Sequence, residues 1–552
     1  MGLLRMRNPL CLLLAIPLIC ACGSKDGEKQ TPDRLPPLPP AECNLPAIEE
    51  HDTVYYACDC AKGAADGCSP GDDSADGTSP ERAFRTYDRA RRSFADLQPG
   101  NAVAFCRGGA FDIEGGGTWE NSRCLADWPC FVRDYDPGTG TNLPAPLIRG
   151  DERGAFQFAD GGDANHEEGY TLANLDLRGE GQSDRGLYFY NDIDDVRICG
   201  LRIDGFRLGV HVGGSNAPES DSDGLNERIV LLDSRITNNS GQGWLGSCNG
   251  CAIERCVFDN NGFGEATFNH NLYLGGADQA DGMRVVDNEL RRSTIVNGEC
   301  RGVSLVVHGN RDGLLIEGNR IEEELGAVGR GCWGIAVDTG YPQAERFENI
   351  IIRRNTVVNV GNLGIGVNAC QDCLIENNVI IHGQESGTRA IAAPTQDRQE
   401  DDATMERVVV RNNTVVIGST GTAITVAGEG RGHVVVSNAI VFTNDDGDAA
   451  CFRTNLSEDS YRAIDHNLCS YSEGRWTRDH NTLAQWQEES GFDEHSLDIP
   501  PEFTSVEGAK LDLAAASNES PLVDNGHPEL SSEQDFTGAP RTGSPDIGAY
   551  ER

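Results

Sequence analysis

A short repeated unit limits what this chain can fold into more than any other feature of its sequence. In each copy one column position, most often asparagine, is followed two residues later by an apolar side chain. Successive column positions lie 22 to 36 residues apart, and short β-branched runs flank them. The eleven column residues are Leu175, Leu201, Ser234, Cys256, Asn288, Asn319, Asn355, Asn378, Asn413, Asn438 and Asn467.

An irregular period of this length is typical of a parallel β-helix. Each coil supplies two or three short strands that pair in parallel with the coils above and below, and loops of variable length leave at one corner. Asparagine suits the bend between two strands because it tolerates left-handed backbone, and stacked amides hydrogen-bond along the column. Leucine-rich repeats also contain asparagine ladders, but their period is narrower and needs leucines that this chain lacks. We therefore predict an all-β solenoid of about eleven or more coils.

A second short segment precedes many of the column positions. Its side chains alternate with period two, which buries one face of a strand and leaves the other face open. We expect any functional site to lie on this open face. These segments begin at Gly186, Gly209, Asn271, Val303, Gly334, Gly364, Ala390 and Ala423.

Both ends of the repeat region resemble those of known proteins. Residues 76–80 and the helical pattern at 81–97 resemble an N-terminal cap in which an amphipathic helix covers the open core. Three further segments resemble the ending of many secreted bacterial β-helix proteins: 520–524, 535–541 and 545–551. Over roughly residues 76–552 the chain thus resembles the pectate-lyase-like superfamily. This implies a right-handed parallel β-helix with a short N-terminal capping helix, but members include polysaccharide lyases, hydrolases, epimerases and proteins without known activity.

The N-terminus predicts export. Arg5 and Arg7 precede an apolar run, Leu10–Ile19, that is too short to span a bilayer. The residues that follow resemble a bacterial lipobox, in which Ala21 precedes the cysteine to be acylated, Cys22. We expect the protein to be lipid-anchored to the cell envelope, at the outer membrane or cell surface. The alternative is a plain secretory signal with incidental cysteines.

The chain divides into five predicted parts. No run after the signal approaches a transmembrane length, so lipid is the only membrane anchor that we predict. Proline-rich sequence after the lipobox suits an extended tether. The parts are a signal peptide (1–21), a polar and proline-rich tether (22–45), a cysteine-rich segment (46–75), the β-helix (76–480) and a C-terminal cap and tail (481–552).

Cysteine usage agrees with an oxidising compartment. Of the 20 cysteines, three lie in the signal and lipobox, and the odd remainder leaves at least one thiol free. We expect disulfides Cys124–Cys130 and Cys451–Cys469, and one within the group Cys43, Cys58, Cys60 and Cys68. The two Cys-x-x-Cys pairs, 248/251 and 370/373, leave zinc as an alternative to disulfides.

A formal net charge of −41 narrows the class of partner. Such a surface repels nucleic acid and anionic lipid, and it repels a polyanionic polysaccharide unless cations or local arginines intervene. We expect a polysaccharide partner, no nucleic acid and a monomeric protein.

The strand motif at 269–275 gives the candidate active site. It resembles the His-Asn-(Ile/Leu)-Tyr-(Ile/Leu) strand of many β-helix proteins, including relatives of alginate and chondroitin lyases. Alternation places Tyr273 on the open face. Aligning the next coils then gives one outward column, Gly275, His308, Asp338 and Asn368. Stacked coils lie about 4.8 Å apart, so Asp338 is expected to touch His308 and raise its basicity.

These residues suit β-elimination from a uronic acid. We predict His308 or His270 as base, Tyr273 as acid and Arg311 as the cation that neutralises the carboxylate. The chain departs from the resembling lyases, which carry Lys and Arg on the following coil, since only Arg311 matches. The alternative is that His270 caps a strand and Tyr273 decorates a wall. Glycoside hydrolysis is the weaker prediction, because it needs paired carboxylates and Asp338 is the one candidate.

Calcium is the one cofactor that the sequence suggests. Asp221, Asp223, Asn226 and Glu227 present oxygen atoms around a glycine turn, as a hard cation requires. The alternative is a solvated acidic loop. Two functions are therefore expected: a surface-anchored polysaccharide-active enzyme, most simply a lyase, or a non-catalytic β-helix for adhesion, glycan binding or envelope structure.

Overall fold

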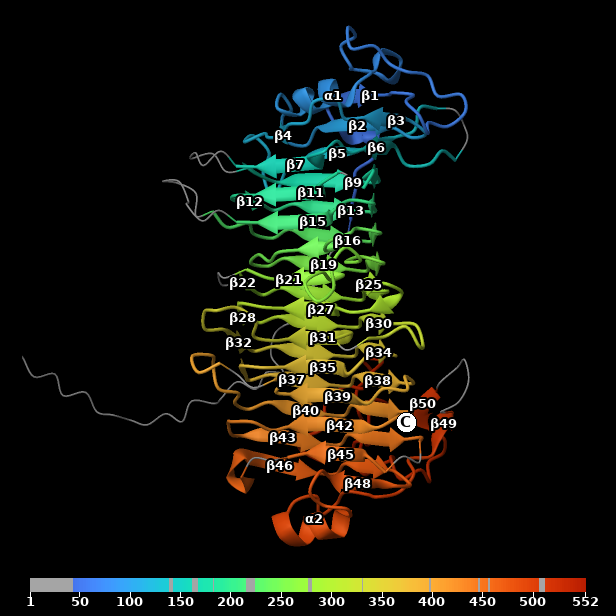
Figure 1. Ribbon diagram of the computed structural model, residues 1–552. Helices are drawn as coiled ribbons and strands as arrows, with labels where there is room; N and C mark the ends of the chain where they lie inside the picture. Colours follow the sequence, from blue (N-terminus) through green and yellow to red (C-terminus); the bar gives the residue numbers. More distant parts are fainter. Residues whose placement is uncertain are drawn as a thin grey trace, which may run out of the picture. The chain divides into compact units, whose positions relative to one another are not determined.

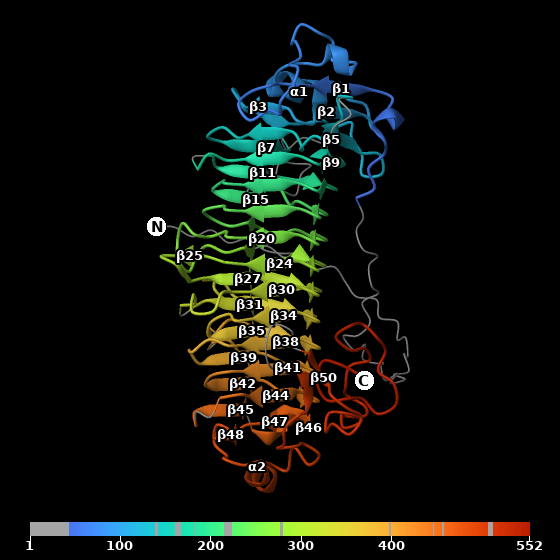
Figure 2. The same ribbon diagram turned by 90° about the vertical axis from the view of Figure 1, so that its right-hand side faces the viewer.

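The computed structural model describes residues 43–138, 142–160, 167–181, 183–214, 224–276, 280–329, 331–396, 399–444, 447–454, 457–505 and 512–552. Within these residues the chain forms a right-handed parallel β-helix, which confirms the predicted fold (Figures 1 and 2). Three long parallel sheets, called A, B and C below, form its walls. Each coil contributes one strand to each sheet in turn.

Sheet A has 14 strands and sheets B and C have 13 each within the described residues. Sheet A consists of β1 (Val54–Ala57), β2 (Ala102–Cys106), β5 (Cys130–Tyr135), β9 (Tyr170–Ala173), β13 (Arg197–Cys199), β16 (Val230–Leu232), β19 (Ala252–Glu254), β23 (Arg284–Val286), β29 (Leu315–Glu317), β33 (Ile351–Arg353), β37 (Leu374–Glu376), β40 (Val409–Arg411), β43 (His433–Val436) and β46 (Tyr461–Asp465). Sheet B consists of β3 (Ala110–Asp112), β6 (Leu147–Arg149), β10 (Asp176–Arg178), β14 (Arg202–Asp204), β17 (Arg235–Thr237), β20 (Val257–Asp259), β24 (Glu289–Arg291), β30 (Arg320–Glu322), β34 (Thr356–Val358), β38 (Val379–His382), β41 (Thr414–Ile417), β44 (Ala439–Phe442) and β47 (Leu468–Ser470).

Sheet C carries the open face predicted above. It consists of β4 (Thr118–Trp119), β7 (Gly154–Ala159), β11 (Arg185–Tyr190), β15 (Leu208–Gly213), β18 (Trp244–Leu245), β21 (Leu272–Leu274), β27 (Val303–Val307), β31 (Trp333–Val337), β35 (Leu363–Val367), β39 (Thr388–Ala393), β42 (Gly421–Val426), β45 (Ala449–Arg453) and β48 (Gly474–Thr477). Shorter sheets lie beside the three walls: β22 (Ala280–Asp281), β28 (Asn310–Asp312), β32 (Arg346–Glu348) and β36 (Cys370–Gln371) in one, with the pairs β8 (Glu167–Glu168) and β12 (Ile193–Asp194), β25 (Ile295–Val296) and β26 (Glu299–Cys300), and β49 (Phe503–Ser505) and β50 (Asp512–Ala515).

Short helices occur near the two ends of the coils. Helix α1 (Tyr87–Phe94) lies within the predicted helical segment and buries Tyr87, Ala90 and Phe94 in the core. Strand β1 precedes it in the chain, so the cysteine-rich segment already supplies a strand of sheet A. Helix α2 (Leu483–Ser490) follows the last coil and buries Trp486. The structure also has 3-10 turns at η2 (Ile48–Glu50), η3 (Pro80–Arg82) and η4 (Glu458–Ser460). No helix among the described residues is long and apolar enough to cross a membrane.

The asparagine column forms a continuous ladder at the corner between sheets A and B, as predicted. From Asn288 to Asn438, each side-chain Nδ2 donates to Oδ1 of the next asparagine at 2.9–3.0 Å, ending on Asn467. The prediction was wrong in one respect. The left-handed residue is the one before each asparagine, with φ of 50° to 68° at Asp287, Gly318, Arg354, Asn377, Asn412, Ser437 and His466.

Eight disulfides and one free thiol account for the cysteines from Cys43 onward. The pairs Cys124–Cys130 and Cys451–Cys469 confirm two predictions, and Cys60–Cys68 confirms the third. Both Cys-x-x-Cys motifs are disulfides rather than zinc ligands. The remaining pairs join more distant cysteines: Cys43–Cys199, Cys58–Cys106 and Cys300–Cys332.

The free thiol of Cys256 is expected to be inert in the folded protein. It is buried in the ladder column, and burial raises its pKa to about 12, so little reactive thiolate exists near neutral pH. In protein lacking residues 1–22, a thiol-specific chromogenic reagent should count no thiol in native protein and one in guanidinium. Rapid native reaction, or more than one thiol after unfolding, would contradict this assignment.

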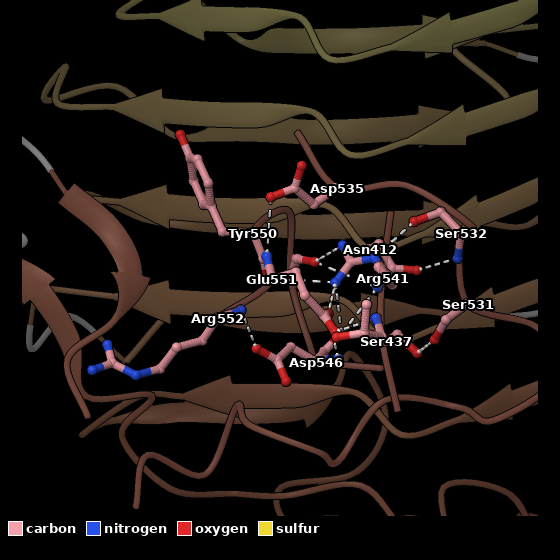
Figure 3. Close-up of polar contacts among 12 residues, drawn as sticks. Asn412, Ser437, Ser531, Ser532, Asp535, Arg541, Asp546, Tyr550, Glu551 and Arg552 are labelled. Carbon is pink, nitrogen blue, oxygen red and sulfur yellow. Dashed lines mark hydrogen bonds and ion pairs between the residues drawn. The ribbon is translucent and has the colours of Figure 1, made fainter. Parts of the chain in front are cut away.

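The C-terminal segment folds back over the outside of sheet B (Figure 2). Leu513 and Ala549 pack against Val379 and Val416, so the tail covers apolar side chains of sheet B. The side chain of Arg541 is only 3% exposed, donates to Glu551 Oε2 at 2.9 Å, and also donates to backbone carbonyls of the tail (Figure 3).

Replacing Arg541 with alanine is expected to lower the free energy of unfolding by about 3 kcal/mol, because it leaves the buried Glu551 carboxylate without its partner. Urea denaturation of Arg541→Ala, Glu551→Gln and the double variant measures the loss and the coupling. Arg462→Ala, at an exposed position of β46, is the matched control. A loss no larger than that of the control would show that the tail does not depend on this ion pair.

Candidate functional site

The outer face of sheet C carries a line of stacked side chains. Strand register places Tyr188, His211, Leu245 and Tyr273 at equivalent positions of four successive coils. The rings of Tyr188 and His211 stack with centroids 4.8 Å apart, and the Arg185 guanidinium lies 4.2 Å from the centroid of Tyr188. This line offers flat, partly apolar surface next to polar groups, a combination that suits sugar rings.

A cavity of about 300 Å³ opens beside this line. This volume is at the lower end of the usual range for small-molecule sites. Three residues of the stacked line, His211, Leu245 and Tyr273, contribute to the cavity wall. Ser247 and Tyr341 line it as well. Burial lowers the pKa of His211 to about 4, and the Arg185 and Arg207 charges act in the same direction, so His211 is neutral near pH 7.

Tyr273 faces outward between the buried Leu272 and Leu274, as alternation predicts. Its hydroxyl lies 3.0 Å from that of Tyr341, which also accepts the backbone N–H of Gly276 at 3.2 Å. Burial raises the pKa of Tyr273, as does Tyr341, so its phenol stays protonated at neutral pH. This state is the one that a general acid requires.

The tyrosine pair depends on a glycine beside it. A Cβ atom at Gly275 would lie 2.0 Å from Cε1 of Tyr273 and 2.6 Å from the hydroxyl of Tyr341. No side chain larger than hydrogen therefore fits while both rings keep these positions. Tyr341 itself was missed in the sequence, since it lies on the loop after β31 and outside the repeat pattern.

His308 follows β27 and lies against both tyrosines. Its ring centroid is 5.5 Å from that of Tyr273 and 5.4 Å from that of Tyr341. Its Nδ1 lies 2.6 Å from the backbone carbonyl oxygen of Asp338. A carbonyl only accepts, so Nδ1 donates, and in the neutral ring Nε2 carries the lone pair. This tautomer is the one that a general base needs.

Asp338 touches His308 through its backbone rather than through its carboxylate. The four residues of the predicted column follow paired positions, because Leu274, Val307, Val337 and Val367 pair in register just before them. However, the buried Asp338 carboxylate accepts from Thr395 Oγ1 at 2.6 Å and from Gln396 Nε2 at 3.3 Å. It thereby links sheet C to the loop after β39, and burial raises its pKa.

His270 lies behind Tyr273. It is buried, its Nδ1 contacts the backbone of Val303, and its ring stacks on Tyr273 with centroids 5.5 Å apart. Burial lowers the pKa of His270 to about 3, so the ring is neutral. In this position it supports the tyrosine ring.

Arg311 lies beneath the cavity wall. Its side chain is buried, and Nη2 donates to Ser247 Oγ at 2.9 Å, which places the charge beside a residue that lines the cavity. Burial lowers the pKa of Arg311 to about 10, opposed by Tyr341, Glu345 and Asp281, so it remains charged at pH 7.

Glu345 fixes the loop that carries Tyr341. Its carboxylate accepts the backbone N–H groups of Gly309, Gly340 and Tyr341, the last at 2.7 Å. The same carboxylate thus joins the turn after His308 to the turn of Tyr341. Sequence analysis did not identify Glu345, because no local motif marks a residue that acts across coils.

The predicted calcium loop and lipid site are only partly described. Asp221, Asp223 and Cys22 lie outside the described residues. Asn226 accepts the N–H of Ile193 and donates to the carbonyl of Gly213, both at 3.0 Å. Glu227 pairs with Arg228 and accepts from Asn249. These two side chains bind other residues of the same chain, and calcium binding stays a prediction.

No protein family matches the chain, and no curated protein sequence matches it. Among solved structures, pectate lyase Pel9A is 11% identical with a TM-score of 0.42, over 91% of this chain and 97% of that one. The catalytic unit of GH87 α-1,3-glucanase from Streptomyces thermodiastaticus strain HF3-3 is 13% identical with a TM-score of 0.38, over 75% and 70%. A mannuronic acid specific polysaccharide family 6 lyase from human gut microbiota is 15% identical with a TM-score of 0.37, over 74% and 89%. At such values these structures say nothing about which residues act in this chain.

Proposed function

We propose that the protein binds an acidic polysaccharide along the outer face of sheet C and cleaves it by β-elimination beside Tyr273. The observation that carries this proposal is the position of His308, whose Nδ1 lies against the Asp338 carbonyl and whose ring packs against Tyr273 and Tyr341. The neighbouring cavity has the Arg311 charge beneath its wall. Base, acid and cation are the three groups that the reaction needs.

The proposed steps use each group once. His308 Nε2 removes the proton α to the uronate carboxylate, and the charge of Arg311 offsets the negative charge that develops there. The electron pair of that C–H bond forms the C=C bond as the C–O bond to the leaving sugar breaks. A hydroxyl of the tyrosine pair protonates the leaving oxygen. His308 then returns its proton through solvent to the tyrosine.

Hydrolysis has less support among the described residues. A glycosidase needs two carboxyl groups on the open face, roughly 5 to 10 Å apart. Asp338 is the carboxylate of the predicted column, and Thr395 and Gln396 already bind it.

The test incubates the purified protein with a panel of uronate polysaccharides, with and without calcium, and follows the ultraviolet absorbance of unsaturated sugars. A rise with one substrate supports elimination. New reducing ends without that absorbance would instead indicate hydrolysis.

Binding without cleavage is the second candidate. It is favoured by the two tyrosine hydroxyls, which bind each other, and by Arg311, which is only 2% exposed. In that case the stacked line from Tyr188 to Tyr273 is an adhesion surface or part of the envelope structure. A positive glycan array, with no product from any substrate on the panel, would select this function.

Export and acylation of Cys22 remain part of the proposal. Eight disulfides support export, because such bonds persist in oxidising compartments. Labelling with a fatty acid that carries a chemical tag should mark the wild-type protein and not Cys22→Ala. Equal labelling of both would show that Cys22 is not the acylated residue.

A further inference from the structure

Three histidines and a carboxylate meet at the corner between sheets A and B, near the last coil and away from sheet C. Asp465 ends β46 and His466 follows it, while His495 comes from the segment after α2. The rings of His466 and His495 stack with centroids 4.8 Å apart. His527, from the C-terminal tail, lies 5.1 Å from His466 between centroids. Segments separate in the sequence thus bring these groups together.

We infer that Asp465, His466 and His495 form a binding site for a divalent transition metal such as Zn²⁺. One ligand atom from each of the three lies within 4.8 Å of those of the other two. Zinc binds imidazole nitrogen and carboxylate oxygen at about 2.0–2.2 Å, so neighbouring ligand atoms of a site lie about 3.3 Å apart. The side chain of His495 is 58% exposed and has room for the small rotation that closes the set.

A hydrogen bond orients the first imidazole ligand. His466 Nδ1 lies 2.9 Å from the backbone oxygen of Asn525, so it donates there, and in the neutral ring Nε2 carries the lone pair. A carbonyl on the second ring nitrogen is a usual support of a metal-binding histidine. Nε2 of His466 and Nδ1 of His495 lie 3.9 Å and 2.8 Å from Asp465 Oδ2, so an ion held by the three residues would replace the hydrogen bond between His495 and Asp465.

His527 flanks the site rather than completing it. Its Nδ1 accepts the backbone N–H groups of Glu529 and Leu530, both at 3.2 Å, which leaves the hydrogen on Nε2. Three protein ligands and water would therefore surround the ion. Two nitrogen ligands favour zinc, copper or nickel over calcium and magnesium, which prefer oxygen.

Metal binding would connect three parts of the C-terminal region. Asp465 and His466 belong to the last turn from sheet A to sheet B, and His495 to the segment after α2. His466 also binds Asn525 of the tail. A ligand that binds only the folded state stabilises it. Zinc is therefore expected to raise the unfolding temperature and to slow proteolysis of the tail.

The test measures Zn²⁺ binding to the untagged protein by competition with a chromogenic chelator. His466→Asn keeps a residue that tolerates the left-handed backbone, and His495→Gln alters an exposed side chain. Each should weaken zinc binding at least about 100-fold. His480→Gln is the matched control, since His480 Nε2 lies 3.1 Å from the Glu489 carboxylate and is not part of the cluster. It should bind zinc as the wild type does.

Cobalt gives a second readout, which reports the ligands of the bound ion directly. Co²⁺ bound by nitrogen and oxygen should give visible absorption bands that zinc, but not excess calcium, removes. Equal zinc affinity in the wild type and in the His466→Asn/His495→Gln double variant would overturn the inference. Loss of cobalt bands on adding calcium would overturn it as well.

Discussion

Replacing His308 with glutamine is expected to lower kcat for β-elimination about 1,000-fold, with little change in glycan affinity. A positioned general base contributes about 10²–10⁴ in rate, and glutamine keeps a polar side chain of similar size while it lacks a basic nitrogen. Stopped assays of unsaturated product give kcat, and equilibrium glycan binding shows whether the surface is intact.

The control for this prediction is His480→Gln, which changes a histidine beside α2 rather than one on sheet C. It should retain wild-type kcat. His270→Gln separates the two histidines of the motif, because His270 is buried behind Tyr273 and is expected to act by positioning that ring. Full activity in His308→Gln, with a large loss of kcat in His270→Gln at unchanged stability, would transfer the role of base to His270.

Removing one rung of the asparagine ladder is expected to lower the free energy of unfolding by about 4 kcal/mol. Asn378 Oδ1 accepts both the backbone N–H and Nδ2 of Asn355, each at 3.0 Å. In Asn378→Ala the buried backbone N–H of Asn355 loses its acceptor and the carbonyl of Ile352 loses its donor, whereas Asn355 Nδ2 keeps the carbonyls of Ile316 and Arg353. Each buried group left unpaired costs about 1–3 kcal/mol.

Guanidinium denaturation, followed by circular dichroism, measures this loss. Asn481→Ala is the matched control, because Asn481 is exposed and lies outside the coils, and surface changes usually stay within about 0.5 kcal/mol. A loss below 1 kcal/mol for Asn378→Ala would mean that water or a shifted backbone replaces the rung.

The repeat made most of the fold predictable. A column in which Asn288, Asn319 and Asn355 are each followed two residues later by an apolar side chain fixes the register of sheet B. The alternation in 272–274 likewise gave the direction of Tyr273. The odd cysteine count required a free thiol, but it did not identify Cys256, since pairing depends on which coils are neighbours. The earliest coils, at β2–β7, lacked the asparagine and were not counted.

The candidate site was predictable only where it follows the repeat. His308 and Tyr273 were found because register stacks them, and Arg311 because it lies on the same coil as His308. Tyr341 and Glu345 were missed, since they belong to an irregular loop whose path no period describes. The tautomer of His308 and the burial of His270 depend on backbone groups from other coils, which a linear pattern does not contain.

The sequence by itself determined the parallel β-helix, its asparagine ladder and the open face of sheet C. These follow from local rules, because each coil repeats the same alternation and the same bend. Only the tertiary structure decided which open-face groups meet. In that structure the Asp338 carboxylate binds Thr395, and the Arg311 guanidinium lies behind the cavity wall. Asp465, His466 and His495 lie together at the corner between sheets A and B. Such contacts join coils and tails through loops of unequal length, so spacing along the chain does not encode them.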